Sequence, residues 1–137
     1  MARFPYLLLD NNPTSLMPRL PLTLTLNNQS VNVIGLLDSG ATINVLPSSL
    51  GLALGAVWEE QTTVVSLAGN LGQAEARGLV LMATHPQLTE EPVRLVFGWT
   101  QAENAPVIFG QMNFFVEFDV CFFRPQQMFD VRLKGDR

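Results

Sequence analysis

The chain has 137 residues, a length that favours a single domain spanning residues 1–137. It carries 8 Lys and Arg residues against 12 Asp and Glu, a net charge of −4 without a basic cluster, which argues against nucleic acid or an anionic membrane surface as a partner. Charged residues make up 15% of the chain, below the usual share of roughly 25%, so we expect some apolar surface to contact another chain.

Short strands separated by turn residues are predicted along most of the chain. Leu at every second position of 20–26 is the pattern of a half-buried strand, which turn residues join to a return strand at 31–37. The remaining predicted elements, in chain order, are a helical turn at 48–54, a hairpin of strands 62–67 and 73–83 joined by 68–72, strands at 93–97 and 106–109, an amphipathic helix at 111–118, and closing strands at 120–123 and 128–133. This spacing predicts an all-β barrel or sandwich with one short C-terminal helix.

Cys121 is the only cysteine and His85 the only histidine. One cysteine cannot form an intrachain disulfide, and a lone His with a lone Cys is too few for the usual metal cages. His85 lies in a loop sequence, Thr84-His85-Pro86-Gln87, so a histidine-based catalytic triad is disfavoured. We therefore expect no metal site and no cofactor.

No stretch of the sequence is typical of a targeting or membrane segment. The apolar run Tyr6-Leu7-Leu8-Leu9 ends at Asp10 and is too short for the core of a signal peptide. The longest run of apolar and glycine residues, 50–58, is well below the roughly 20 residues needed to cross a bilayer. We expect no membrane association and a cytoplasmic location.

The segment Asp38-Ser39-Gly40-Ala41 directly follows the apolar run 33–37. All but the last are common turn residues, so a plain turn is one interpretation. The apolar pattern resumes at once in 42–46, which places this turn inside the barrel rather than at a hairpin tip. Because a carboxylate there costs free energy unless it is paired or hydrogen-bonded, we expect Asp38 to be functional.

With this motif and two others, the chain resembles the retropepsin-type aspartic proteases, the family of the retroviral proteases and their bacterial relatives. Residues 36–41, Leu-Leu-Asp-Ser-Gly-Ala, match the family's catalytic signature, and the glycine-bearing segment 68–72 lies where the family has its flap. Val107-Ile108-Phe109-Gly110 before a predicted helix matches the second signature. The resemblance covers most of 20–123 and implies a closed β-barrel, one lobe of the acid-protease fold.

The resemblance also implies a role for each matching residue. Asp38 would be the catalytic carboxylate, the Ser39 hydroxyl would bond across a dimer, and Gly40 would allow backbone and substrate to approach closely. The implied substrate-binding residues are Ala41, Val45, Gly69, Asn70, Leu71, Gly72 and Ile108. Each residue other than Asp38 is also consistent with packing alone.

The sequence departs from the family at two places. Retroviral members usually carry an Asp soon after the catalytic motif and an Arg after the second-motif glycine, and these two pair with each other. Here the positions hold Thr42 and Gln111, which avoids an unpaired buried charge. The segment after Gly110 also has one more residue than the commoner form in cellular relatives.

A single Asp-Ser-Gly motif implies two chains. Aspartic proteases need two carboxylates about one water, and because like charges about 3 Å apart cannot both ionise, the pair shares one proton. A complete site would therefore require a homodimer with Asp38 from each chain on the two-fold axis. The resemblance thus implies an aspartic endopeptidase that acts on polypeptide substrates as a homodimer.

Two other functions remain open from the sequence. The first is a catalytically silent module of the same fold that binds or scaffolds peptides, because fold alone does not imply activity. The second is an unrelated small β-barrel that binds a small ligand, with Asp38 in an ordinary turn. The second would leave the 107–110 motif and the glycine-bearing hairpin as coincidences.

Overall fold

The computed structural model describes residues 1–9 and 13–136, so Asp10, which ends the N-terminal apolar run, lies outside the described residues. The described part is mostly β-structure. Its strands are β1 Ala2–Pro5, β2 Arg19–Leu26, β3 Gln29–Leu37, β4 Asn44–Leu46, β5 Val64–Val65, β6 Ala76–Thr84, β7 Val93–Thr100, β8 Ile108–Phe109, β9 Phe118–Phe123 and β10 Met128–Leu133. Its helices are α1 Ser48–Ala53, α2 Phe114–Glu117 and the short 3-10 helices η1 Pro13–Ser15, η2 Trp58–Glu60, η3 Gly69–Gln73, η4 Arg124–Gln126 and η5 Lys134–Asp136.

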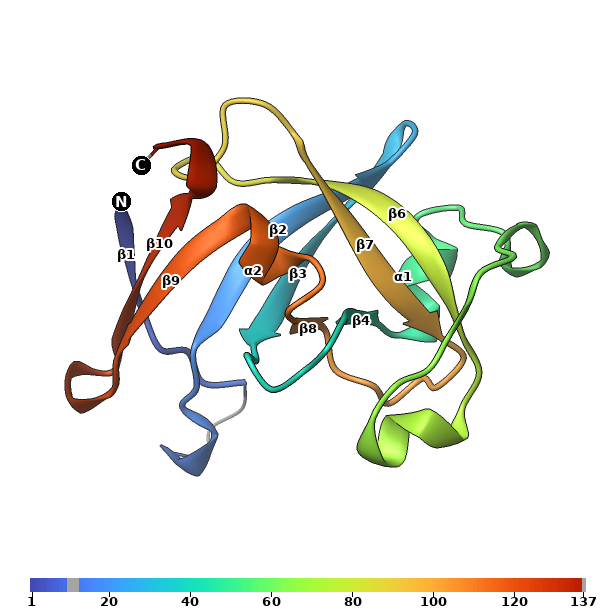
Figure 1. Ribbon diagram of the computed structural model, residues 1–137, viewed down its shortest axis with the longest axis horizontal. Helices are drawn as coiled ribbons and strands as arrows, with labels where there is room; N and C mark the ends of the chain where they lie inside the picture. Colours follow the sequence, from blue (N-terminus) through green and yellow to red (C-terminus); the bar gives the residue numbers. More distant parts are fainter. Residues whose placement is uncertain (10–12, 137) are drawn as a thin grey trace.

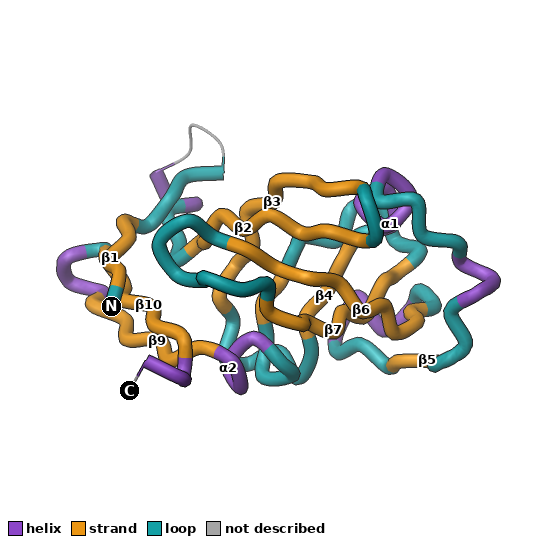
Figure 2. The backbone as a smooth tube through the Cα atoms, turned by 90° about the horizontal axis from the view of Figure 1, so that it is seen from above, coloured by secondary structure: helices purple, strands orange, loops and turns teal. Residues whose placement is uncertain are grey.

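Six strands close into a barrel. They follow the order β2-β3-β8-β4-β7-β6, and a further pairing of β2 with β6 completes the ring, while β5 pairs with the start of β6. The expected all-β barrel is therefore confirmed. A separate antiparallel sheet, β1-β10-β9, lies at one end of the molecule, opposite β5 (Figures 1 and 2).

The hairpin of β2 and β3 forms where the sequence predicts it. Leu20, Leu22 and Leu24 are buried along β2, so alternate residues face the core as a strand with one buried face requires. Asn27, at the turn, has a φ of 53°, a left-handed conformation that Asn adopts more readily than most residues. The strands pair from Arg19 with Leu36 to Leu26 with Gln29.

An aromatic stack joins the C-terminal helix to the barrel. The ring of Phe114 in α2 lies 5.0 Å from that of Phe109 in β8 and 4.6 Å from that of Phe118 at the start of β9. All three side chains are buried. The short helix is therefore held by this core contact, since four residues alone cannot form a stable helix in water.

Several predicted bounds were wrong. The helix expected at 111–118 is confined to Phe114–Glu117, because the Met112 carbonyl, which a longer helix would pair with the Val116 N–H, accepts the Asn44 N–H at 2.7 Å. The strand expected at 62–67 is reduced to Val64–Val65, the strand expected from 73 begins at Ala76, and β1 was not predicted. Within the described residues, no helix is long and apolar enough to cross a membrane.

Candidate active site

Asp38 lies at the end of β3, where this strand meets β8. The two strands are parallel, with Leu36 opposite Ile108 and Leu37 opposite Phe109. The Asp38 N–H donates a hydrogen bond of 3.0 Å to the Phe109 carbonyl, which extends the ladder by one step. The Asp38 side chain is half-buried. The structure therefore places Asp38 at the end of a barrel strand, as predicted, but Ser39 and Gly40 are exposed, so the turn lies at the surface of the barrel rather than inside it.

The residues after Asp38 form a tight turn around its carboxylate. Gly40 N–H donates to Asp38 Oδ1 at 2.9 Å, and Ala41 N–H donates to the Asp38 carbonyl at 3.1 Å. A side chain reaching forward to a backbone N–H two residues on is the Asx-turn geometry that Asp favours. A Cβ at position 40 would lie 3.2 Å from Asp38 Oδ1, so glycine leaves room for the turn to close. Asp38 is held in one orientation as a result.

The two sequence motifs lie against each other. Gln111 N–H donates to the Ala41 carbonyl at 2.9 Å, and Met112 N–H donates to the Thr42 carbonyl at 3.0 Å. At Gly110, a Cβ would lie 2.7 Å from the Ile43 carbonyl oxygen, closer than real Cβ atoms approach. The glycine of the second motif is therefore required by the close approach of the two loops.

A cavity of about 250 Å³ opens beside this turn. Among the described residues that line it, Asp38 alone carries a charge, and most of the others are apolar. Of the residues predicted for the site, the structure places seven at this cavity: Asp38, Gly40, Ala41, Val45, Gly69, Leu71 and Ile108. Ser39, Asn70 and Gly72 do not line it and are exposed.

Three lining residues were not predicted, namely Thr42, Ile43 and Leu67, and a fourth, Ala68, was expected only as part of the flap segment 68–72. The signal for Ile43 was present in the sequence, because Ala41, Ile43 and Val45 are spaced by two and an extended chain points them to one side. Leu67 comes from a segment far along the chain and just before the expected flap. Its placement depends on how that segment folds back on the barrel, which local sequence does not show.

The segment expected to form a flap lies against the cavity, but its tip is not a simple hairpin turn. Residues Gly69–Gln73 form the 3-10 helix η3 between β5 and β6. Gly69 has a φ of +63°, and a Cβ at position 72 would lie 2.6 Å from the Leu67 carbonyl oxygen. Both glycines are therefore needed for this shape. Leu67 is buried in an apolar cluster with Val45 and Ile108, and Leu71 packs against that cluster.

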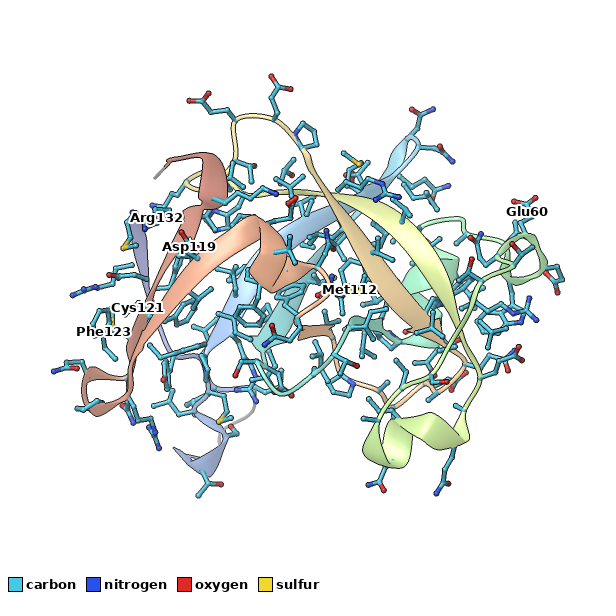
Figure 3. The ribbon with its side chains drawn as sticks, in the orientation of Figure 1. Glu60, Met112, Asp119, Cys121, Phe123 and Arg132 are labelled. Carbon is cyan, nitrogen blue, oxygen red and sulfur yellow. The ribbon has the colours of Figure 1, made fainter. Side chains whose placement is uncertain are left out.

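The lone histidine and cysteine lie away from this cavity. The ring of His85 contacts that of Phe4 edge-on at 5.3 Å, its Nδ1 accepts the Gln87 N–H at 3.1 Å, and burial lowers its pKa. Figure 3 shows Cys121 on β9, well apart from Met112, which follows the second motif. In the part of the chain that the structure describes, no group of three or more His, Cys, Asp or Glu side chains could hold a metal ion.

Comparisons with known proteins agree with this geometry at the level of fold. No family model matches the sequence, and a search of curated proteins gives no match. Among solved structures, the chain is similar to a retropepsin-like aspartic protease from Rickettsia conorii, with a TM-score of 0.59 and 12% sequence identity over 96% of this chain and 98% of that chain. The chain therefore has a retropepsin-like β-barrel fold, the architecture that its two motifs implied.

Proposed function

We propose that the chain is an aspartic endopeptidase, active as a homodimer, that hydrolyses peptide bonds through a water activated by two Asp38 carboxylates, one from each subunit. The observation that carries this proposal is the placement of Asp38. Its carboxylate is fixed by the Gly40 N–H and, among the described residues, is the one charged group lining an apolar cavity. Peptide hydrolysis of this kind needs two carboxylates that share one proton, and a second Asp38 brought beside the first would complete such a pair.

The chemistry follows from the shared proton of such a pair. The ionised carboxylate takes a proton from the water as the water attacks the peptide carbonyl carbon. The protonated carboxylate donates a hydrogen bond to the carbonyl oxygen, on which negative charge develops. The carboxyl group that took the proton from the water then gives it to the amide nitrogen, the C–N bond breaks, and a carboxylic acid and an amine are released. The two carboxylates and the water account for every proton transfer, so the proposed reaction uses no cofactor and no metal.

The proposed homodimer follows from the number of carboxylates in the site. Each chain brings one Asp-Ser-Gly turn, and a two-fold axis beside it would bring a second Asp38 to the same water. Ser39 is exposed, while its carbonyl oxygen accepts the side-chain N–H of Gln111 at 2.6 Å. The Ser39 hydroxyl is thus placed on the surface of a turn held from within its own subunit, where a partner turn could reach it.

The lining of the cavity indicates the substrate class. Ile43, Val45, Leu67 and Ile108 present aliphatic groups, and the η3 segment lies along the same cavity. An extended peptide bound there would bury apolar side chains near the scissile bond, with the Gly69–Gln73 segment as the proposed flap over its backbone.

Because Cys121 is exposed and outside any disulfide, we place the enzyme in a reducing compartment, the cytoplasm.

The proposal is tested by incubating the purified chain with a mixture of peptides of varied sequence between pH 4 and pH 8 and identifying the products by mass spectrometry. Asp38→Asn is the matched inactive variant, and Asp119→Asn, on β9, is the control for loss of one carboxylate outside the cavity. We expect cleavage by the wild type and the control but none by Asp38→Asn. Cleavage by Asp38→Asn would overturn the assignment, and peptide binding without cleavage would support the silent binding module instead.

A further inference from the structure

Asn44 is a fully buried amide beside the candidate site. It belongs to β4, whose three residues are all buried, and its exposed fraction is 0%. A buried amide costs free energy unless its oxygen and nitrogen both find partners. Here Oδ1 accepts the Gly110 N–H at 2.8 Å, and Nδ2 donates to the Val96 carbonyl at 2.9 Å and to Asn113 Oδ1 at 3.4 Å. The side chain is satisfied at both ends.

One rigid peptide unit connects this amide to Asp38. The Gly110 N–H that donates to Asn44 and the Phe109 carbonyl that accepts the Asp38 N–H belong to the same peptide group. Since a peptide group is planar and resists twisting, its orientation is set from both sides at once. The Asn44 side chain is therefore connected to the Asp38 N–H through one planar peptide group, with one hydrogen bond on each side of that group.

A second amide supports the first. Asn113 Oδ1 accepts the Val96 N–H at 2.9 Å, and its Nδ2 donates to the Arg94 carbonyl at 3.0 Å. Both groups of Val96 are thus bonded to the amide pair, its carbonyl to Asn44 and its N–H to Asn113. The pair ties β4 and the segment after β8 to β7, a long barrel strand whose register with β6 spans eight residue pairs.

We propose that Asn44 is a positioning residue for Asp38, holding the Phe109–Gly110 peptide group in the orientation that fixes the backbone of the catalytic turn. The effect of Asn44 on hydrolysis rests on the proposed function, whereas its effect on the Asp38 turn does not. Two carboxylates that share a proton must lie within a narrow range of separations, so a loosened turn disturbs the pair before it disturbs peptide binding.

The first test uses hydrogen exchange and needs no enzymatic activity. In Asn44→Ala, we expect the amide protons of Asp38 and Gly110 to exchange about tenfold faster or more, because a lost buried hydrogen bond favours local opening. Thr100→Val is the control, since Thr100 is also fully buried on the barrel and its Oγ1 accepts the Ala102 N–H at 3.1 Å. In Thr100→Val, we expect exchange at Asp38 to stay at the wild-type rate. Unchanged exchange at Asp38 in Asn44→Ala would overturn the proposal.

The second test uses peptide hydrolysis. For Asn44→Ala, we expect kcat to fall by about 100-fold with little change in KM and a displaced pH profile, because a misplacement on the order of 1 Å costs about this much. If kcat of Asn44→Ala falls only in proportion to the fraction of protein that is unfolded, as we expect for the control Thr100→Val, the proposal is contradicted. If Asn44→Ala does not fold, Asn113→Ala replaces it in both tests and is expected to give a smaller effect of the same kind. If the wild type does not hydrolyse peptides, the proposed function fails while the exchange test still decides the role of Asn44.

Discussion

The side-chain N–H of Gln111 donates a hydrogen bond of 2.6 Å to the backbone carbonyl of Ser39. Gln111 stands where the retroviral proteases that the sequence resembles usually have an Arg, and Thr42 stands where they have the Asp that pairs with it. Backbone bonds from Gln111 to Ala41 and from Met112 to Thr42 complete the join between the two loops. A neutral set of hydrogen bonds thus holds the Asp38 turn from within one chain, and no charge needs to be buried for it.

Asp38→Asn is expected to abolish peptide hydrolysis while leaving the fold intact. The amide has nearly the same shape, and its oxygen can still accept the Gly40 N–H, but it cannot take a proton from water. Turnover with a peptide substrate and the thermal unfolding temperature should be measured on the same preparation. A lowered melting temperature would show that the variant lost turnover through unfolding, which would contradict the prediction of an intact fold.

Hydrolysis is expected to show a bell-shaped dependence on pH. Two carboxylates that share one proton are active in the singly protonated form of the pair, so the two limbs belong to the pair and not to one residue. Activity should be highest on the acidic side of neutrality and vanish when both carboxylates ionise. Measurements of kcat/KM from pH 3 to pH 9 check this, and a rate that stays level into the alkaline range speaks against a shared proton.

Replacement of Gly69 or Gly72 by Val is expected to reduce turnover far more than thermal stability. Gly69 has a φ of +63°, where a side chain costs about 1–2 kcal/mol, and at Gly72 a Cβ would meet the Leu67 carbonyl. Both changes deform η3 beside the cavity. Gly55→Val is the matched control, because Gly55 has a φ of +80° but does not line the cavity. If all three variants lose activity only in step with stability, the segment is not a flap.

Acidification is expected to destabilise the protein partly through His85. Burial lowers the pKa of His85 below its ordinary value of 6.5, so the unfolded chain binds a proton there more readily than the folded chain. The neutral ring therefore contributes stability above about pH 6.5, which is lost as the pH falls through that value toward the folded pKa. Thermal unfolding of His85→Gln between pH 5 and pH 8 should vary less than that of the wild type. An equally steep dependence in the variant would assign the effect to other groups.

The ion pair between Arg3 and Asp130 is expected to hold β1 on its sheet. Arg3 donates to both carboxylate oxygens, at 2.7 and 3.1 Å, and this hydrogen bonding lowers the pKa of Asp130 below its ordinary value of 3.8. The ionised pair thus contributes stability above that pH and loses it as the pH falls through the folded pKa. In Asp130→Asn at pH 7, we expect amide exchange in β1 to be faster than in the wild type and amide exchange in β2 to be unchanged. Asp119→Asn, which removes the 3.4 Å pair with Arg132 on the same sheet, is the control and should leave exchange in β1 at the wild-type rate.

The sequence predicted those features that depend on neighbouring residues. Alternation of Leu in 20–26 and the turn after it determine the β2–β3 hairpin, because a strand with one buried face needs that period. The Asp-Ser-Gly turn could also be predicted, since the Asp38 carboxylate bonds to an N–H only two residues away. Closely spaced strands were enough to indicate an all-β barrel or sandwich, and the resemblance of the motifs to the retropepsin-type proteases favoured the barrel. These features are local, and local sequence contains the information for them.

Tertiary structure alone decided the rest. The expected helix at 111–118 lost its first turn because the Met112 carbonyl accepts the N–H of Asn44, a residue about seventy positions earlier in the sequence, instead of an N–H of its own helix. Leu67 lines the cavity only because the segment between β5 and β6 folds back on β4 and β8. Asn44 is the one polar residue of the short strand β4, which the sequence shows. Its hydrogen-bond partners on β7 and after β8 are brought to it only when the barrel closes. Long-range hydrogen bonds depend on the positions of several strands at once, and no window of neighbouring residues specifies them.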